Sequence, residues 1–185
     1  MGNNAKNVSA GKPKVTGAVF VAPAGSAIPA DAVAPLDTVY KCMGYVSEEG
    51  VKNNQDVTTK DTNAWGGDVV ASTVTGYKET FEMTFIETNL IVLKEYYGEN
   101  NVTETGNTIA IAHGPTDAQG HPWVIETVLN NGRIQRDVIP NGKIGARGEK
   151  VYADGNNIAY KMTINALPGS DGKTAHTYIA SAGVS

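Results

Sequence analysis

The sequence predicts a mainly β protein, an antiparallel β-sandwich or barrel with one flanking α-helix and a long projecting loop. Three observations lead to this prediction: an excess of β-branched residues, a series of short alternating segments separated by turns, and one segment with helical periodicity. The chain has 185 residues, with 19 Val and 12 Ile but only 5 Leu. Because β-branched side chains favour pleated strands and Leu favours helices, this ratio favours strands.

The clearest strand lies between Tyr77 and Glu87, where aromatic and polar side chains alternate. Phe81, Met83 and Phe85 share one phase, which predicts a strand with one buried face. Further strands are predicted at residues 15–21, 38–47, 108–112, 123–129, 133–139, 149–152, 158–166 and 177–180. Turn sequences follow two of them, Asn-Asn-Gly at 130–132 and Pro-Asn-Gly at 140–142. About seven to nine short strands imply a sandwich or barrel.

The helical segment runs from Leu90 to Tyr97, with Asn89 as its N-cap and Gly98 as its stop. Residues 1–14 are polar and basic, and we expect a flexible arm there. Residues 15–185 are expected to form a single domain, since this length is typical of one.

Residues 48–67 are the least apolar internal segment, with only Val51, Val57, Ala64 and Trp65 as apolar groups. Unstructured connections of that length are usually functional or disordered. Because the flanking segments are strand-like, we expect a long projecting hairpin or loop, roughly from Glu49 to Gly67.

Composition argues against several kinds of function. A net charge of −4 does not favour tight nucleic-acid binding. The single Cys42 cannot form an internal disulfide, and it is expected to fill space in a strand. No apolar run approaches membrane-spanning length and the polar start is not a secretory signal, so folding in a reducing cytoplasm is expected.

Catalytic and metal-binding patterns are weak. His113 and His121 flank a turn and have no third His or Cys nearby, which favours a turn or surface role. Trp65 and Trp123 are interpreted as core or contact anchors, with sugar stacking as the alternative. We therefore expect no catalytic, cofactor-binding or metal-binding residues, and no enzyme.

Charge is segregated along the chain. Residues 47–104 contain eleven acidic and four basic side chains, whereas residues 131–150 contain five basic and two acidic ones. Opposite regions on one small protein allow copies to dock head-to-tail, which produces rings or filaments. The predicted basic self-docking patch is Arg133, Arg136, Lys143 and Arg147.

Several segments, in this order and spacing, resemble one known family. They are GKPKVTGAVFVAP, YKCMGYVSEEGVKNN, TTKDTNAWGGDVV, YKETFEMTFIET, NLIVLKEYYG, RIQRDVIPNGKI and NNIAYKMTINALPGSDG. Together they span nearly the whole chain, which is similar to the tail tube (major tail) protein of bacteriophages with long non-contractile tails.

This resemblance implies a virion protein, made and assembled in the bacterial host cytoplasm, whose hexameric rings stack into a tube. The implied partners are further copies of the chain, a tape measure protein, a tail terminator and a distal tail protein. The resemblance also implies that double-stranded genome DNA passes through the tube during ejection without specific binding, and that no membrane is involved. The inner tube of contractile tails is close in fold and stays an alternative to the non-contractile type.

Within that resemblance, residues 48–67 correspond to a loop that reaches the neighbouring ring. The expected contacts are Glu49, Val51, Asp56, Lys60, Asp61 and Trp65, with Trp65 as the anchor. Glu82 and Asp68 are expected to face the lumen, because acidic groups keep DNA phosphates off the wall. Glu82 is preferred over Glu79, which shares its strand phase with Phe81.

The alternative is a β-sandwich binding module, such as a phage decoration protein or a carbohydrate-binding protein. Such a module would use Trp65 and Trp123 as ligand platforms.

Overall fold

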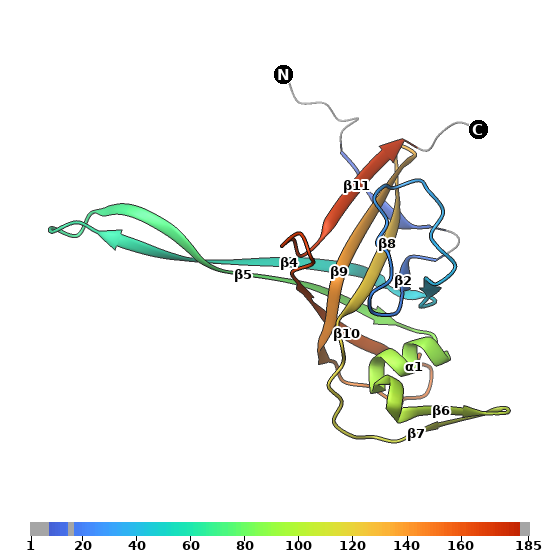
Figure 1. The fold of residues 1–185 in the computed structure, drawn as a ribbon. Helices are drawn as coiled ribbons and strands as arrows, with labels where there is room; N and C mark the ends of the chain where they lie inside the picture. The colour runs from blue at the N-terminus through green and yellow to red at the C-terminus, as the bar shows by residue number, and fades with distance from the viewer. Residues whose placement is uncertain (1–7, 15–16, 182–185) are drawn as a thin grey trace.

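The protein is mainly β with one α-helix over the described residues, as the sequence predicted (Figure 1). The computed structural model describes residues 8–14 and 17–181. The helices are α1 (Leu90–Tyr97) and the short 3-10 helix η2 (Glu99–Asn101). The strands are β1 (Gly11–Pro13), β2 (Val19–Val21), β3 (Lys41–Cys42), β4 (Val46–Asn63), β5 (Val69–Phe85), β6 (Val102–Thr105), β7 (Thr108–Ile111), β8 (His121–Leu129), β9 (Arg133–Arg147), β10 (Tyr160–Leu167) and β11 (His176–Ser181).

The main sheet has the order β3-β2-β8-β9-β10-β5-β4, with β1 also paired to β8 and β11 to β9. Its strand pairings are antiparallel. Strand β9 changes partner along one edge, because residues 133–138 pair with β11 and residues 141–147 pair with β10. A strand that changes partners in this way lets a sheet fold into two packed layers. The small hairpin β6-β7 is separate.

The core lies between these layers and under α1. Phe81, Met83 and Phe85 of β5 are at most 5% exposed, which confirms the buried phase predicted for this strand. Trp123 of β8 is fully buried in the same cluster. Helix α1 adds Val92, Leu93 and Tyr96 to the cluster.

The ends of α1 lie where the sequence placed them. The Asn89 side chain accepts a hydrogen bond from the Val92 backbone N–H over 2.9 Å, as expected of an N-cap. At the other end the Gly98 N–H donates to the Lys94 carbonyl, and the positive φ of 96° at Gly98 favours glycine.

The Pro-Asn-Gly sequence at 140–142 is not a turn, and the predicted end of the strand at Ile139 was wrong. Strand β9 continues to Arg147, with an extra residue where its register against β8 shifts between His121 and Trp123. This is a β-bulge, and Pro and Gly, which favour turns, are also the residues found at bulges within strands. A side chain at Gly142 would place its Cβ 2.5 Å from Trp123 Cδ1, so the bulge requires glycine.

Other boundaries also differ. Residues 48–63 belong to a continuous strand. Of the two expectations for this segment, a projecting hairpin or a loop, the hairpin is therefore correct. Residues 149–152 form no strand within the described chain, whereas β6 was not predicted and pairs with β7. Of the expected N-terminal arm, residues 1–7 lie outside the described residues, while β1 pairs with the end of β8.

Candidate functional site

The most distinctive feature is the hairpin formed by β4 and β5, which extends far beyond the body (Figure 1). Strand β10 covers the free edge of β5 only between Glu79 and Phe85. From the Val57–Tyr77 pair outward the hairpin is therefore a two-stranded ribbon that pairs with no third strand of the described chain. Because an isolated two-stranded hairpin is only marginally stable in water, this ribbon is suited to gain stability from a partner.

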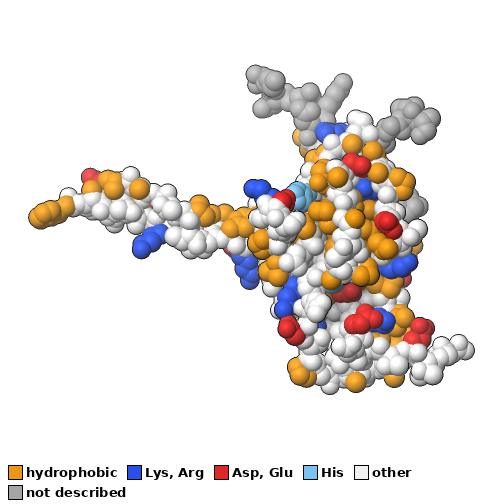
Figure 2. All heavy atoms as spheres, viewed as in Figure 1, with side chains coloured by type: hydrophobic (Ala, Val, Ile, Leu, Met, Phe, Trp, Pro, Cys, Tyr) orange, Lys and Arg blue, Asp and Glu red, His pale blue; other side chains and the backbone are white. Residues whose placement is uncertain are grey.

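One face of this ribbon carries most of its large exposed apolar side chains. Val57 lies opposite Tyr77, Thr59 opposite Val74, and Asn63 opposite Val69. Directly opposed residues point to the same side of a sheet, so these pairs continue the face that carries Phe81 in the core. Val57, Val74 and Val69 are 56–61% exposed, and hydrophobic side chains are visible along the hairpin in Figure 2. We call these three valines the apolar hairpin face.

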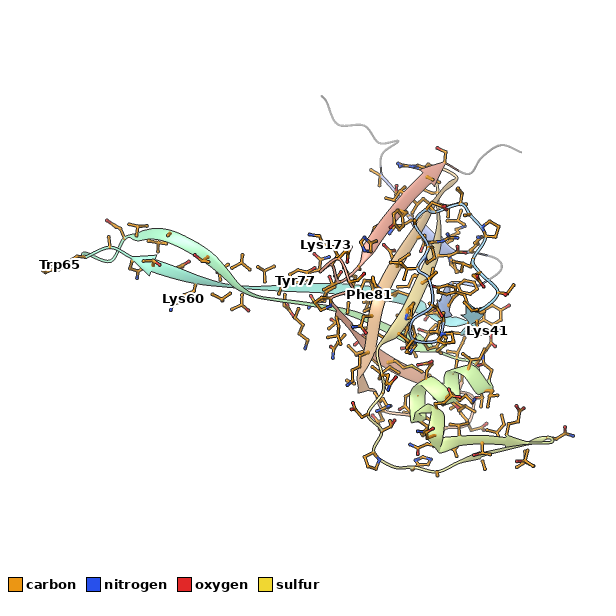
Figure 3. The ribbon with its side chains drawn as sticks, viewed as in Figure 1. Lys41, Lys60, Trp65, Tyr77, Phe81 and Lys173 are labelled. Carbon is orange, nitrogen blue, oxygen red and sulfur yellow. The ribbon has the colours of Figure 1, made fainter. Side chains whose placement is uncertain are left out.

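The opposite face carries most of the charges of the hairpin, although Asp61, which lies opposite Ser72, shares the phase of Val57. Asp56 lies opposite Lys78 and Lys60 opposite Thr73, and both pairs have the opposite phase to Val57. The turn at the tip presents Trp65, which is fully exposed at the far end of the molecule (Figure 3). A fully exposed indole on a projecting turn is typical of a residue that anchors a binding interface.

A buried carboxylate fixes the base of the hairpin. Glu79 is 4% exposed and its Oε1 accepts hydrogen bonds from Asn53 Nδ2 over 2.9 Å and Gln55 Nε2 over 3.0 Å. Its Oε2 accepts hydrogen bonds from the Tyr77 and Thr174 hydroxyls. Burial by itself raises the pKa of Glu79, but these hydrogen bonds together lower the pKa below its usual value. The network joins both hairpin strands to the segment before β11.

The residues expected to contact a neighbouring ring separate into two groups. Asp56, Lys60, Asp61 and Trp65 are exposed on the projecting ribbon or its tip. Glu49 and Val51 lie where β4 crosses the body: Glu49 pairs with Lys52, and Val51 packs against the core. The contact prediction itself remains a proposal, taken up below.

The two acids expected in the lumen lie at opposite ends of β5. Glu82 is half-buried in the opposite phase to Phe81, with its carboxylate 3.0 Å from Lys161 Nζ and 3.9 Å from Lys52 Nζ. Asp68 belongs to the tip, where its carbonyl accepts a hydrogen bond from the Ala64 N–H. They therefore cannot form one cluster within a single chain.

The four basic residues proposed for self-docking do not form one patch. Arg133 and Arg147 are exposed at opposite ends of β9, and Lys143 Nζ is 2.7 Å from Asp117. Including Arg136 was wrong, because its side chain is 1% exposed and its charge is paired with Glu126 inside the protein. The alternation in β9 could have indicated this, since Arg136 shares its phase with Val138.

The alternative in which Trp65 and Trp123 are ligand platforms fails for Trp123, since this side chain is buried in the core.

The histidines have local partners. His121 Nε2 lies 3.0 Å from Glu95 on α1, and His113 packs against Tyr97. Burial lowers the pKa of His121, but the hydrogen bond and charge of Glu95 reverse this, so the pKa is raised overall. Cys42 is a half-buried free thiol. The described residues contain no group of three or more His, Cys, Asp or Glu suited to a metal ion.

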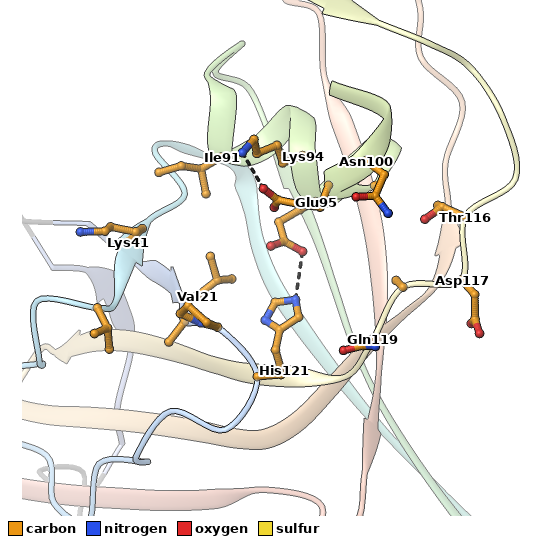
Figure 4. Close-up of a pocket in the computed structure, with 17 residues that line it drawn as sticks. Val21, Lys41, Ile91, Lys94, Glu95, Asn100, Thr116, Asp117, Gln119 and His121 are labelled. Atoms are coloured by element: carbon orange, nitrogen blue, oxygen red, sulfur yellow. Dashed lines mark hydrogen bonds and ion pairs between the residues drawn. The ribbon is translucent and has the colours of Figure 1, made fainter. Parts of the chain in front are cut away.

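Sequence reasoning missed a pocket beside α1, shown in Figure 4. It has a volume of about 680 Å³ and is lined by residues from β2, α1 and the connection before β8. Its walls include Val21, Ile91 and Val39, and its charged groups are the two lysines Lys41 and Lys94 and the three carboxylates of Glu95, Glu99 and Asp117. No sequence pattern marked it, because the lining comes from separate parts of the chain.

The structure therefore defines a β scaffold with a projecting, partly apolar hairpin, a feature suited to contact with another protein chain. The family model described as phage tail tube protein matches residues 1–184, and the chain belongs to this family. The family is structural, which implies a non-enzymatic component of the virion. A comparison with curated protein sequences found no match. Within the described residues, no helix is both long enough and apolar enough to cross a membrane.

Proposed function

We propose that this chain forms hexameric rings that stack into the tube of a long non-contractile phage tail, and that genome DNA passes through that tube during ejection. The observation that carries the proposal is the two-stranded hairpin with its exposed apolar face and fully exposed Trp65. The tape measure protein, the tail terminator and the distal tail protein would be its other partners.

In this proposal the hairpin connects one ring to the next. Its apolar face and Trp65 lose water contact only when another copy covers them, and burial of apolar surface contributes about 25 cal/mol per Å². Asp56, Lys60 and Asp61 would supply polar contacts around this area, as in the rim of other interfaces.

Hairpin shortening tests the proposal directly. Residues 58–76 can be replaced by Asn-Gly, which leaves the Val57–Tyr77 pair to close the turn. Deleting only residues 50–64 would remove the β4 residues that pair with Met83 and Phe81, and would disturb the body. The shortened chain should remain a folded monomer and form no tubes by negative-stain electron microscopy.

A matched pair of substitutions separates the two faces. Val57→Thr with Val74→Thr keeps β-branched side chains but removes apolar surface, and should raise the protein concentration needed for tube formation. Lys60→Thr changes the opposite face and should have a much smaller effect. Normal tubes from the shortened chain, or equal effects of both substitutions, would contradict the proposal.

Glu82 has a proposed role on the channel wall. Its carboxylate lies 3.0 Å from Lys161 Nζ, a cation that would otherwise be free to hold DNA phosphates, whereas Lys52, 3.9 Å away, is also paired with Glu49. An electron cryo-microscopy map of the tube should place Glu82 on the channel surface. A map with Glu82 on the outer surface would refute this role.

A further inference from the structure

The pocket beside α1 is a candidate receptor for the hairpin tip. We propose that Trp65 of one copy inserts into this pocket of the next copy. The inference rests on the proposed function, because it requires the chain to polymerise. It adds which surface of the neighbouring subunit receives the hairpin.

The position of the two surfaces supports a head-to-tail contact. Trp65 is at the tip of the hairpin, and Lys41 at the pocket lies on the opposite side of the body (Figure 3). A contact between two different surfaces of identical chains is heterologous, so it can repeat indefinitely along a line. An arrangement with both surfaces at one end would instead favour closed dimers.

The pocket also matches the tip in size and chemistry. Its volume of about 680 Å³ lies in the range that holds compact organic groups, so one indole with its adjoining turn can enter. Val21, Val39 and Ile91 provide apolar walls for the ring. Gly66 and Gly67 follow Trp65 and have open space around their α-carbons, so the turn is narrow where it would enter.

Charge gives a second match. In the described residues, Lys94 pairs with Glu99, and Glu95 and Asp117 pair with His121 and Lys143. Lys41 Nζ donates to the Thr38 carbonyl, and no described carboxylate lies within ion-pair distance of it. Asp68 in the same turn as Trp65 is likewise without an ion pair among the described residues. An incoming tip would bring Asp68 toward Lys41.

Cysteine crosslinking tests which surface receives the tip. In a Cys42→Ser background, Ala64→Cys, which lies next to Trp65 in the exposed tip and leaves the indole in place, is combined with Gln119→Cys in the pocket, or with Tyr45→Cys in a second hollow near β4. Assembled protein is treated with a short bismaleimide and analysed by denaturing electrophoresis. The Gln119 pair should give a ladder of dimers, trimers and longer chains, because each copy both donates and receives a tip. The Tyr45 pair should remain largely monomeric.

Fluorescence of the unmodified protein provides a second measurement that needs no cysteine variant. Trp123 is already buried, so a blue shift on polymerisation must come mainly from Trp65. Trp65→Phe should remove that shift, and Trp65→Ala should raise the critical concentration for assembly at least about tenfold. Lys41→Glu should also weaken assembly, and adding Asp68→Lys should restore part of it.

The possible results separate this inference from the proposed function. Tubes without a Gln119 ladder, with a Tyr45 ladder, or without a tryptophan blue shift would overturn the inference and leave the tube function standing. If the unmodified chain formed no tubes under any condition that supports phage tails, both would be overturned.

Discussion

Replacing Glu126 by alanine should strongly destabilise the monomer, because Arg136 would lose its buried counter-ion. The two residues lie directly opposite one another in the β8-β9 pairing. Their side chains are 2% and 1% exposed, and Arg136 Nε donates to Glu126 Oε1 over 2.9 Å. Lys14 Nζ lies 2.8 Å from the other carboxylate oxygen, so the substitution also frees this part of the N-terminal segment.

The expected magnitude follows from what remains around the guanidinium. Breaking a buried ion pair by removing one partner costs about 3–5 kcal/mol. Arg136 would keep the carbonyl oxygens of Asp31 and Ala34, each 2.9 Å from one of its nitrogens, which favours the lower end of that range. A loss of about 3 kcal/mol corresponds to a fall in Tm of roughly 6–12 °C for a chain of this length.

The assay is urea unfolding at a concentration where the protein is monomeric, followed by circular dichroism and tryptophan fluorescence. Glu126→Gln should be less damaging than Glu126→Ala because it keeps an acceptor. The double variant Glu126→Leu with Arg136→Met should recover much of the loss, since it removes both buried charges. A loss below about 1 kcal/mol for Glu126→Ala, or a double variant no more stable than the single one, would refute the reasoning.

Three smaller effects can be measured with the same methods. Asn89→Ala should lower the free energy of unfolding by about 1 kcal/mol or more, because the Val92 N–H loses its acceptor and the Met43 carbonyl loses its side-chain donor; Asn89→Ser keeps an N-cap acceptor and should lose less, and equal losses would argue against capping. Because the pKa of Glu79 is lower in the folded protein, its carboxylate contributes stability at pH values above its unfolded pKa of about 4.5. This stabilisation is lost as the pH falls through the pKa of Glu79 in the folded protein. Glu79→Gln should therefore reduce the fall in stability between about pH 6 and pH 3, and an unchanged profile would contradict this. The pKa of His121 is raised in the folded protein, so its contribution to stability is complete below about pH 6.5 and is lost as the pH rises through its folded pKa. Glu95→Gln should lower the pKa of His121 measured by NMR, and an unchanged pKa would exclude the pairing of His121 with Glu95.

The local patterns in the sequence were sufficient for much of the fold. The alternation around Phe81 predicted a strand with one buried face, and the Asn89 and Gly98 signals located α1 at both ends. These features depend on side-chain periodicity and capping, which act between residues close in the chain.

The outer hairpin and the β9 bulge were harder to predict. Residues 52–63 are exposed on both faces, so their strand has no apolar alternation and is defined by backbone pairing with β5. The Pro-Asn-Gly segment has turn chemistry, but its pairing with β8 and β10 keeps it in a strand. Both outcomes depend on partners distant in sequence.

By itself, the sequence determined the β class, the α-helix and a projecting segment that contains Trp65, since these follow from composition and short-range pattern. Only the tertiary structure decided that Arg136 is buried against Glu126, that Glu79 anchors the hairpin, and that a pocket lies across the body from the tip. The physical reason is that burial and charge pairing depend on which strands become neighbours, and that choice is made by the packed fold as a whole.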